Sequence, residues 1–232
     1  MRAAVIVYPG SNCDRDVTSV LQDVMGAAPQ RVWHNDTTLP PVDIVVLPGG
    51  FSYGDYLRCG AMAAHSAIMH AVKAHAERGG YVLGICNGFQ VLTETGLLPG
   101  VLLPNAGSHF ICKDVFLRVE QSHPPFTSEY TAGQVVSIPV AHHDGNYFSP
   151  PEQLQALEDN QQIAFRYCNA QGELTADSNP NGSLNNIAGV FNNKRNVLGM
   201  MPHPERHADP LTGGTDGRAL FSALGALQGE VT

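Results

Sequence analysis

Continuous apolar runs alternate with helical patterns through the first half of the chain. The runs suit strands that are buried on both faces of a sheet, and they span residues 3–8, 43–47 and 81–85. Patterns with one apolar face follow them and predict three helices, one ending near residue 25 and two at residues 61–78 and 87–95. A short strand is also expected at residues 32–33. This alternation predicts parallel strands joined by right-handed crossovers.

The second half of the chain has mostly strand signals. Apolar stretches predict strands at residues 115–119, 135–138, 163–167, 187–191 and 197–201. Short helices are expected within residues 150–160 and at residues 215–227, the latter with Thr215 or Asp216 as its N-cap. We therefore predict one α/β domain over residues 1–232, in which a mostly parallel, doubly wound, flavodoxin-like sheet carries an added antiparallel portion. The polar segment 168–186 is expected to be mobile or to face a partner.

Composition narrows the possible functions. Of the 232 residues 43% are apolar, which is enough for a packed core. The 21 acidic residues outnumber the 13 Lys and Arg residues and give a formal net charge of -8, which disfavours a nucleic-acid binder. The five cysteines are odd in number and include no C-x-x-C pair, so no disulfide framework is expected. Without a run suited to a signal peptide or membrane helix, we expect a cytoplasmic protein.

The segment Gly84-Ile85-Cys86-Asn87-Gly88 places a cysteine between a predicted strand and a predicted helix. Glycines two residues before and after the cysteine are typical of a nucleophile elbow, with Cys in place of Ser. The start of the helix favours a thiolate, and the Asn87 N–H is available to an oxyanion. A small buried cysteine beside two turn glycines is the simpler alternative.

The segment Met201-Pro202-His203-Pro204-Glu205 follows the last predicted strand. Two prolines favour an extended backbone, in which side chains two residues apart share a face, so Glu205 would orient His203 as a base. A proline-rich turn with a surface His and Glu is the alternative. A metal site on His203 and His207 is disfavoured, since Pro204 interrupts the helix that such spacing requires. We expect no metal in this chain.

A third segment, Pro48-Gly49-Gly50, follows the predicted strand at residues 43–47. Because ligand sites in such sheets lie at the carboxyl ends of the strands, this turn is expected beside Cys86 and His203. Its N–H groups suit an oxyanion, although an ordinary turn is the simpler interpretation. Together the three segments predict a thiol nucleophile, a base with its carboxylate and two N–H donors, which is machinery for acyl transfer through a thioester.

These motifs resemble those of the class I (triad-type) glutamine amidotransferases. The chain is similar, more narrowly, to the glutaminase subunits of phosphoribosylformylglycinamidine synthases, through residues 48–58, 84–90, 179–183 and 196–206. The resemblance extends over nearly the whole chain and implies the class I glutamine amidotransferase fold.

By this resemblance, Cys86 attacks the side-chain amide of L-glutamine, His203 transfers protons and Glu205 orients it. The resemblance also assigns the oxyanion hole to the backbone N–H groups of Gly50 and Asn87.

The same resemblance implies that Gln90, His142 and Gly145 bind the substrate. The family usually has Gly, Glu and Arg where this chain has His143, Asp144 and Asn146. Contacts of this segment with the substrate or a partner are therefore expected to differ from those of the family.

The resemblance implies no cofactor in this chain. The ammonia would pass to a separate synthetase subunit, which uses ATP and Mg²⁺, in a complex that also holds a small bridging subunit. Another hydrolase with an elbow cysteine, or a non-catalytic module on the same fold, remains the alternative.

Overall fold

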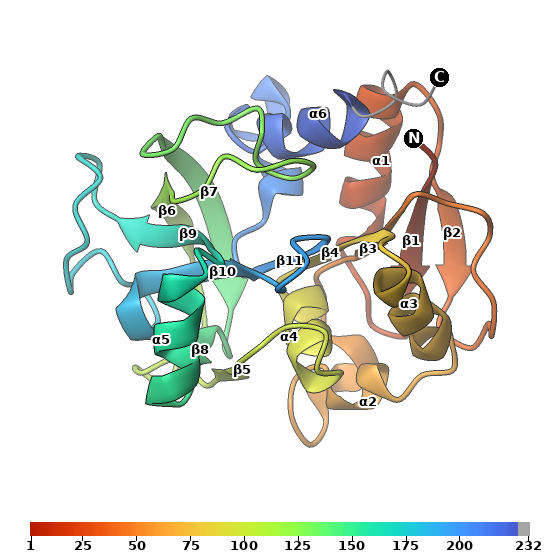
Figure 1. Ribbon diagram of the computed structural model, residues 1–232, viewed down its shortest axis with the longest axis horizontal. Coiled ribbons are helices and arrows are strands. Elements are labelled where there is room, and N and C mark those ends of the chain that lie inside the picture. The colour runs from red at the N-terminus through yellow and green to blue at the C-terminus, as the bar shows by residue number, and fades with distance from the viewer. Residues whose placement is uncertain (227–232) are drawn as a thin grey trace.

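The computed structural model describes residues 1–226, and its centre is a nine-stranded sheet with helices on both faces (Figure 1). The strands are β1 (Ala3–Val7), β2 (Gln30–Trp33), β3 (Ile44–Leu47), β4 (Tyr81–Ile85), β5 (Val101–Leu103), β6 (Ile111–Val119), β7 (Val135–His142), β8 (Asn146–Phe148), β9 (Ile163–Cys168), β10 (Ile187–Phe191) and β11 (Val197–Met200). The helices are α1 (Asp14–Met25), α2 (Ala61–Ala64), α3 (Ile68–Glu77), α4 (Asn87–Glu94), α5 (Pro151–Asp159) and α6 (Arg218–Ala226). Short 3₁₀ turns are η1 (Ser52–Asp55), η2 (Leu184–Asn186), η3 (Pro204–Arg206) and η4 (Pro210–Thr212).

Five adjacent strands, in the order β2-β1-β3-β4-β11, run parallel to one another. Helices α1 and α6 cover one face of this part of the sheet, and α3 and α4 cover the other (Figure 1). Both faces are therefore covered, which is why the apolar runs of these strands are continuous rather than alternating. The carboxyl ends of β1, β3, β4 and β11 meet at one edge of the sheet, as the sequence predicted for the last three.

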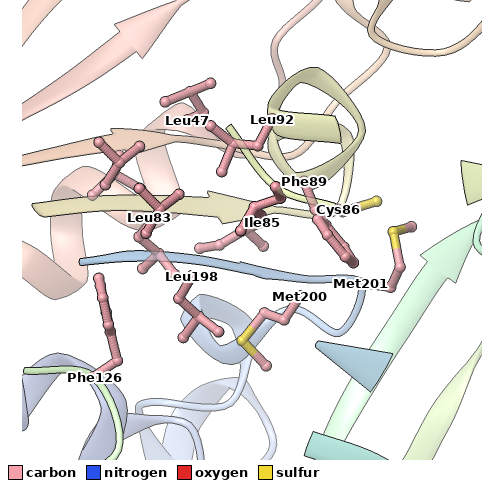
Figure 2. Close-up of a cluster of buried hydrophobic side chains, with 14 of the residues drawn as sticks. Leu47, Leu83, Ile85, Cys86, Phe89, Leu92, Phe126, Leu198, Met200 and Met201 are labelled. Carbon is pink, nitrogen blue, oxygen red and sulfur yellow. The ribbon is translucent and has the colours of Figure 1, made fainter. Parts of the chain in front are cut away.

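The buried core extends along the sheet and includes residues of both its parallel and its antiparallel strands. Figure 2 shows the part around the central parallel strands, where apolar side chains lie on both sides of the strands and Cys86 lies at the margin of the cluster. The side chains labelled there are Leu47, Leu83, Ile85, Cys86, Phe89, Leu92, Phe126, Leu198, Met200 and Met201. The elbow cysteine is thus part of the buried core.

The remaining strands continue the sheet in antiparallel pairs, in the order β11-β10-β9-β6-β7. The predicted antiparallel portion is therefore confirmed, and β6 and β7 are longer than expected. A separate antiparallel pair, β5 and β8, lies beside α5 (Figure 1). No helix among residues 1–226 is long and apolar enough to cross a bilayer.

The helix predicted at residues 61–78 is wrong as a single element, since it divides into α2 and α3. The Ser66 hydroxyl donates to the carbonyl of Ala63 at 2.7 Å, and a serine that bonds the preceding turn in this way competes with the helical ladder. The N–H of Ile68 donates instead to the carbonyl of His34 at 3.2 Å. The break therefore ties α3 to the strand end beside it.

The predicted C-terminal helix differs from the structure in its start and its cap. It starts at Arg218 rather than Thr215, and the Asp216 carboxylate, suggested as its N-cap, accepts the N–H of Ser137 in β7 at 2.7 Å. The predicted end of that helix at residue 227 lies outside the described residues.

Side-chain amides tie the polar segment 168–186 back to the sheet. Asn186 Nδ2 donates to the carbonyl of Tyr167 at 3.0 Å, and Asn181 Nδ2 donates to the carbonyl of Gly145 at 2.8 Å. The segment therefore packs against the loop that follows β7.

Candidate active site

Cys86 occupies the sharp turn between β4 and α4. Its φ of 50° and ψ of −106° are unusual for a residue with a side chain, and such backbone strain of about 1–3 kcal/mol persists only where the surroundings hold it. The flanking glycines make the turn possible, because a Cβ on Gly88 would lie 1.9 Å from the carbonyl oxygen of Leu47. A Cβ on Gly84 would lie 2.7 Å from the carbonyl oxygen of Gly88. The predicted elbow is present.

His203 and Glu205 lie in contact at the carboxyl end of β11. The Nδ1 of His203 is 2.7 Å from Oε1 of Glu205, and both side chains are buried. The predicted extended backbone is wrong, since Pro204–Arg206 forms the 3₁₀ turn η3. Proline at the first position of a helical turn is favoured, because its missing N–H has no partner to lose there. The curvature of the turn, rather than a shared strand face, brings the carboxylate to the imidazole.

The surroundings of His203 set its charge. Burial opposes protonation, but the negative charge of Glu205 and then that of Cys86 raise the pKa of His203 well above its ordinary value. Nδ1 is engaged by Glu205, whereas Nε2 has no hydrogen-bond partner among the described residues. Nε2 is therefore the ring nitrogen that is free to exchange a proton.

The glycine turn after β3 packs directly against this histidine. A Cβ on Gly49 would lie 2.7 Å from Cε1 of His203. Gly50 has a φ of 148° and lies against residues 10–12, where a Cβ would be 2.9 Å from the Asn12 nitrogen. The structure thus brings the predicted Gly49-Gly50 turn to the same sheet edge as Cys86 and His203.

Asn87 opens α4, so its backbone N–H has no partner within the helix. Its side chain is engaged on both sides, because Oδ1 accepts the Ser52 N–H at 3.2 Å and Nδ2 donates to Oε1 of Gln90 at 2.8 Å. Gln90 in turn donates from Nε2 to the carbonyl of Asp144 at 2.6 Å. Gln90 therefore links the elbow helix to the segment that follows β7.

His142 and Gly145 flank that segment and touch each other. A Cβ on Gly145 would lie 2.3 Å from Cε1 of His142, so the ring occupies the space that only glycine leaves open. Oδ1 of Asn105 is 3.1 Å from Nδ1 of His142 and accepts the Gly145 N–H at 3.0 Å. Burial first, and then the charge of His203, lower the pKa of His142 to about 4. His142 is thus neutral at physiological pH and lies near His203.

The structure adds residues that the sequence did not single out. Asp55 and Asp144 lie close enough that burial and then the charge of Asp144 raise the pKa of Asp55, and the Cys59 thiol donates to Asp144 at 3.2 Å. Cys13 follows β1 and lies 3.9 Å from Nδ1 of His203. The sequence could have placed Cys13 in the site, because it follows β1, whose carboxyl end lies at the same sheet edge as those of β3, β4 and β11.

Comparison with known proteins identifies the family. Residues 1–215 match the model of the CobB/CobQ-like glutamine amidotransferase domain. The chain belongs to this glutamine amidotransferase family. Phosphoribosylformylglycinamidine synthase subunit PurQ of Acaryochloris marina is 57% identical over 97% of this chain and 95% of its own length. PurQ of Roseobacter denitrificans is 60% identical over 98% of this chain and 99% of its own length.

A solved structure agrees with this membership. One chain in the structure of PurLQS from Thermotoga maritima is 43% identical to this chain, and the two superpose with a TM-score of 0.86. The match covers 98% of this chain and 98% of the Thermotoga maritima chain. The amidotransferase fold implied by the sequence motifs is therefore confirmed.

Proposed function

We propose that this chain is the glutaminase subunit of a phosphoribosylformylglycinamidine synthase. The near-full-length identity of 57–60% to PurQ subunits carries this proposal. The site geometry supports it, because a strained elbow cysteine, a buried histidine and a buried carboxylate meet at one edge of the sheet. The same proposal treats residues 1–232 as one glutaminase domain that works in the cytoplasm.

The two ring nitrogens of His203 have different roles in the proposed reaction. Nε2 takes the proton of Cys86, and Sγ attacks the side-chain carbonyl carbon of L-glutamine. The C–N bond then breaks, His203 returns the proton to the leaving ammonia, and a glutamyl thioester remains. Water attacks the thioester with His203 as base, so that glutamate leaves and the thiol is restored. Glu205 holds the ring and stabilises the imidazolium form.

The backbone N–H groups of Gly50 and Asn87 stabilise the oxyanion of each tetrahedral intermediate. Gln90, His142 and Gly145 line the side of the site that receives the glutamine. The hydrogen bond from Gln90 to the carbonyl of Asp144 supports this placement, since it positions the loop that carries Gly145 beside the elbow.

The ammonia passes to a synthetase subunit that converts formylglycinamide ribonucleotide into formylglycinamidine ribonucleotide. ATP and Mg²⁺ serve that subunit, and a small bridging subunit joins the complex. The PurLQS assembly of Thermotoga maritima supports a partnership of this kind. No cofactor is needed in this chain, because the thiol, the imidazole and the N–H donors supply the whole amide hydrolysis.

The test measures glutamate release from glutamine by the purified chain, alone and with its synthetase and bridging subunits. We expect release to rise in the complex. Cys86→Ala should abolish glutamine-dependent synthesis and leave ammonia-dependent synthesis intact. Cys112→Ala, which changes an exposed thiol on β6, is the matched control and should behave as the wild type. Glutamine use that persists in the Cys86→Ala complex would contradict the proposed nucleophile.

A further inference from the structure

Cys13 is a second buried thiol beside the same histidine. It precedes α1, its backbone N–H donates to the carbonyl of Gly49 at 3.3 Å, and its side chain is 2% exposed. Its Sγ lies 3.9 Å from Nδ1 of His203, on the Glu205 side of the ring. Cys13 has no part in the proposed hydrolysis, so its place against Nδ1 calls for another explanation.

Three different donor types converge at this point. A sulfur of Cys13, a ring nitrogen of His203 and a carboxylate oxygen of Glu205 all lie within 4.8 Å of one another, and all three residues are buried. Among residues 1–226, no other group of three His, Cys, Asp or Glu side chains converges in this way. The sequence spacing suggested a metal site only at His203 and His207, and no metal was expected, because Cys13 lies far away along the chain.

One carboxylate oxygen of Glu205 is available to bind a ligand. Oε1 of Glu205 faces Nδ1, but Oε2 is buried and has no hydrogen-bond partner among the described residues. A buried oxygen without a partner is costly, by about 1–3 kcal/mol, and such atoms often mark an ion or ligand position.

We propose that Cys13, His203 and Glu205 form a binding site for a thiophilic divalent cation such as Zn²⁺. Zinc bonds of about 2.0–2.3 Å to sulfur, nitrogen and oxygen in a tetrahedral site place donors about 3.5 Å apart. The 3.9 Å between Sγ of Cys13 and Nδ1 of His203 is close to this spacing. The 2.7 Å between Nδ1 and Oε1 is shorter, so Glu205 moves back slightly or presents its free Oε2.

Metal binding at this site switches the histidine off. The Cys13 thiol releases its proton to solvent. The metal takes the Nδ1 position, and the proton that Nδ1 shared with Glu205 passes to Nε2 or, where Nε2 is already protonated, to solvent. The imidazole proton consequently lies on Nε2, the nitrogen that would have to accept the proton of Cys86. This inhibitory effect rests on the proposed glutaminase function, whereas the metal site itself does not.

Arg206 opposes the cation. Its Nη2 donates to Sγ of Cys13 at 3.1 Å, and its Nε reaches Asp16 at 3.4 Å. A guanidinium so near the donor atoms repels a second positive charge, so the site is a moderate binder rather than a permanent structural one. Removal of the Arg206 charge should therefore tighten metal binding.

The test uses Co²⁺ as the optical probe and Zn²⁺ as the competitor, in the full chain carrying Cys86→Ala. This substitution removes the other thiol near His203, so a thiolate-to-cobalt charge-transfer band reports Cys13. We expect the band in Cys86→Ala, its displacement by Zn²⁺, and its loss in Cys13→Ser/Cys86→Ala. Cys59→Ser/Cys86→Ala, which removes a thiol elsewhere in the site region, is the matched control and should keep the band.

Two further measurements keep the test decisive if the Cys13→Ser variant does not fold or if the proposed function is wrong. Arg206→Gln/Cys86→Ala should bind Co²⁺ several-fold more tightly, and Cys13→Ser in an otherwise native chain should need at least tenfold more Zn²⁺ for half-inhibition of glutamine hydrolysis. No band in Cys86→Ala, or a band that survives Cys13→Ser, would overturn the metal site. A band in Cys86→Ala, together with no glutamine hydrolysis by the wild-type chain in its complex, would support the metal site and contradict the proposed function alone.

Discussion

The charge of Glu205 is what makes His203 a strong base in the proposed mechanism, and Glu205→Gln removes that charge without changing the shape of the side chain. At the observed 2.7 Å between Nδ1 and Oε1, a carboxylate and an imidazolium attract each other by about 6 kcal/mol if the effective dielectric constant is about 20. Burial of both groups offsets part of this attraction. The net effect is still a lower pKa of His203 in the variant, because the charge that raises it is gone.

The substitution also acts on the tautomer. A glutamine amide donates its N–H to Nδ1, which leaves the imidazole proton on Nε2, the side that must accept the proton of Cys86. In hydrolytic triads the loss of the carboxylate in this way lowers kcat by about 10⁴. We expect a loss of about 10³–10⁴ in kcat for glutamine hydrolysis with a much smaller change in KM, since the carboxylate does not contact the substrate.

The assay is steady-state glutamate release in the assembled complex, together with the pH dependence of Cys86 alkylation. The alkylation profile should shift in Glu205→Gln, because imidazolium then supports the thiolate only at lower pH. Glu158→Gln is the matched control, since it removes the charge of another ion-paired glutamate, Glu158 on α5, which lies 2.6 Å from Arg166 on β9. A folded Glu205→Gln complex that retains kcat within threefold of the wild type would refute this account of the base.

Two further predictions concern the frame of the site. Gly88→Ala should lower the free energy of unfolding, measured in urea, by about 3 kcal/mol, because the new Cβ would lie 1.9 Å from the Leu47 carbonyl oxygen. Gly26→Ala should lower it by only about 1 kcal/mol, because its Cβ enters open space and only the φ of 68° is unfavourable. Equal losses would contradict the packing argument. The lowered pKa of His142, about 4, means that the unfolded chain takes up a proton first as pH falls below about 6.5, so stability should decrease between pH 6.5 and 4 by up to about 3 kcal/mol. His142→Gln should flatten this part of the urea-measured stability profile, and an unchanged slope would argue against a buried neutral His142.

The parallel half of the sheet was predictable because its signal is local and repeated. Continuous apolar runs can be buried on both faces only between helix layers, so the runs at residues 43–47 and 81–85 indicated both the strands and the crossovers. The site edge followed from this topology, since the carboxyl ends of parallel strands converge whatever the details of the loops. Cys86 and His203 could therefore be placed together although 117 residues separate them in sequence.

The sequence pattern did not predict features that depend on a single side-chain hydrogen bond competing with the backbone hydrogen bonds of a helix. The break between α2 and α3 depends on Ser66 bonding back to Ala63, and an apolar periodicity continues through that point without a sign of it. The pairing of His203 with Glu205 was expected for the wrong reason. Pro204 favours the extended region for His203 but equally favours the first position of a 3₁₀ turn for itself, and the turn is what forms.

Cys13 shows why the second side of the histidine was missed. Its neighbours Gly49 and His203 come from the ends of β3 and β11, and the strand order β1-β3-β4-β11 brings the three segments to one edge of the sheet. The Nδ1 side of His203 faces Glu205 and Cys13, whereas Nε2 has no hydrogen-bond partner among the described residues and is the base in the proposed mechanism. Because an imidazole in its neutral form carries one proton for both nitrogens, whatever binds on the Nδ1 side decides whether Nε2 can act as a base. The proposed catalysis and the proposed metal inhibition are thus two outcomes of the same proton equilibrium.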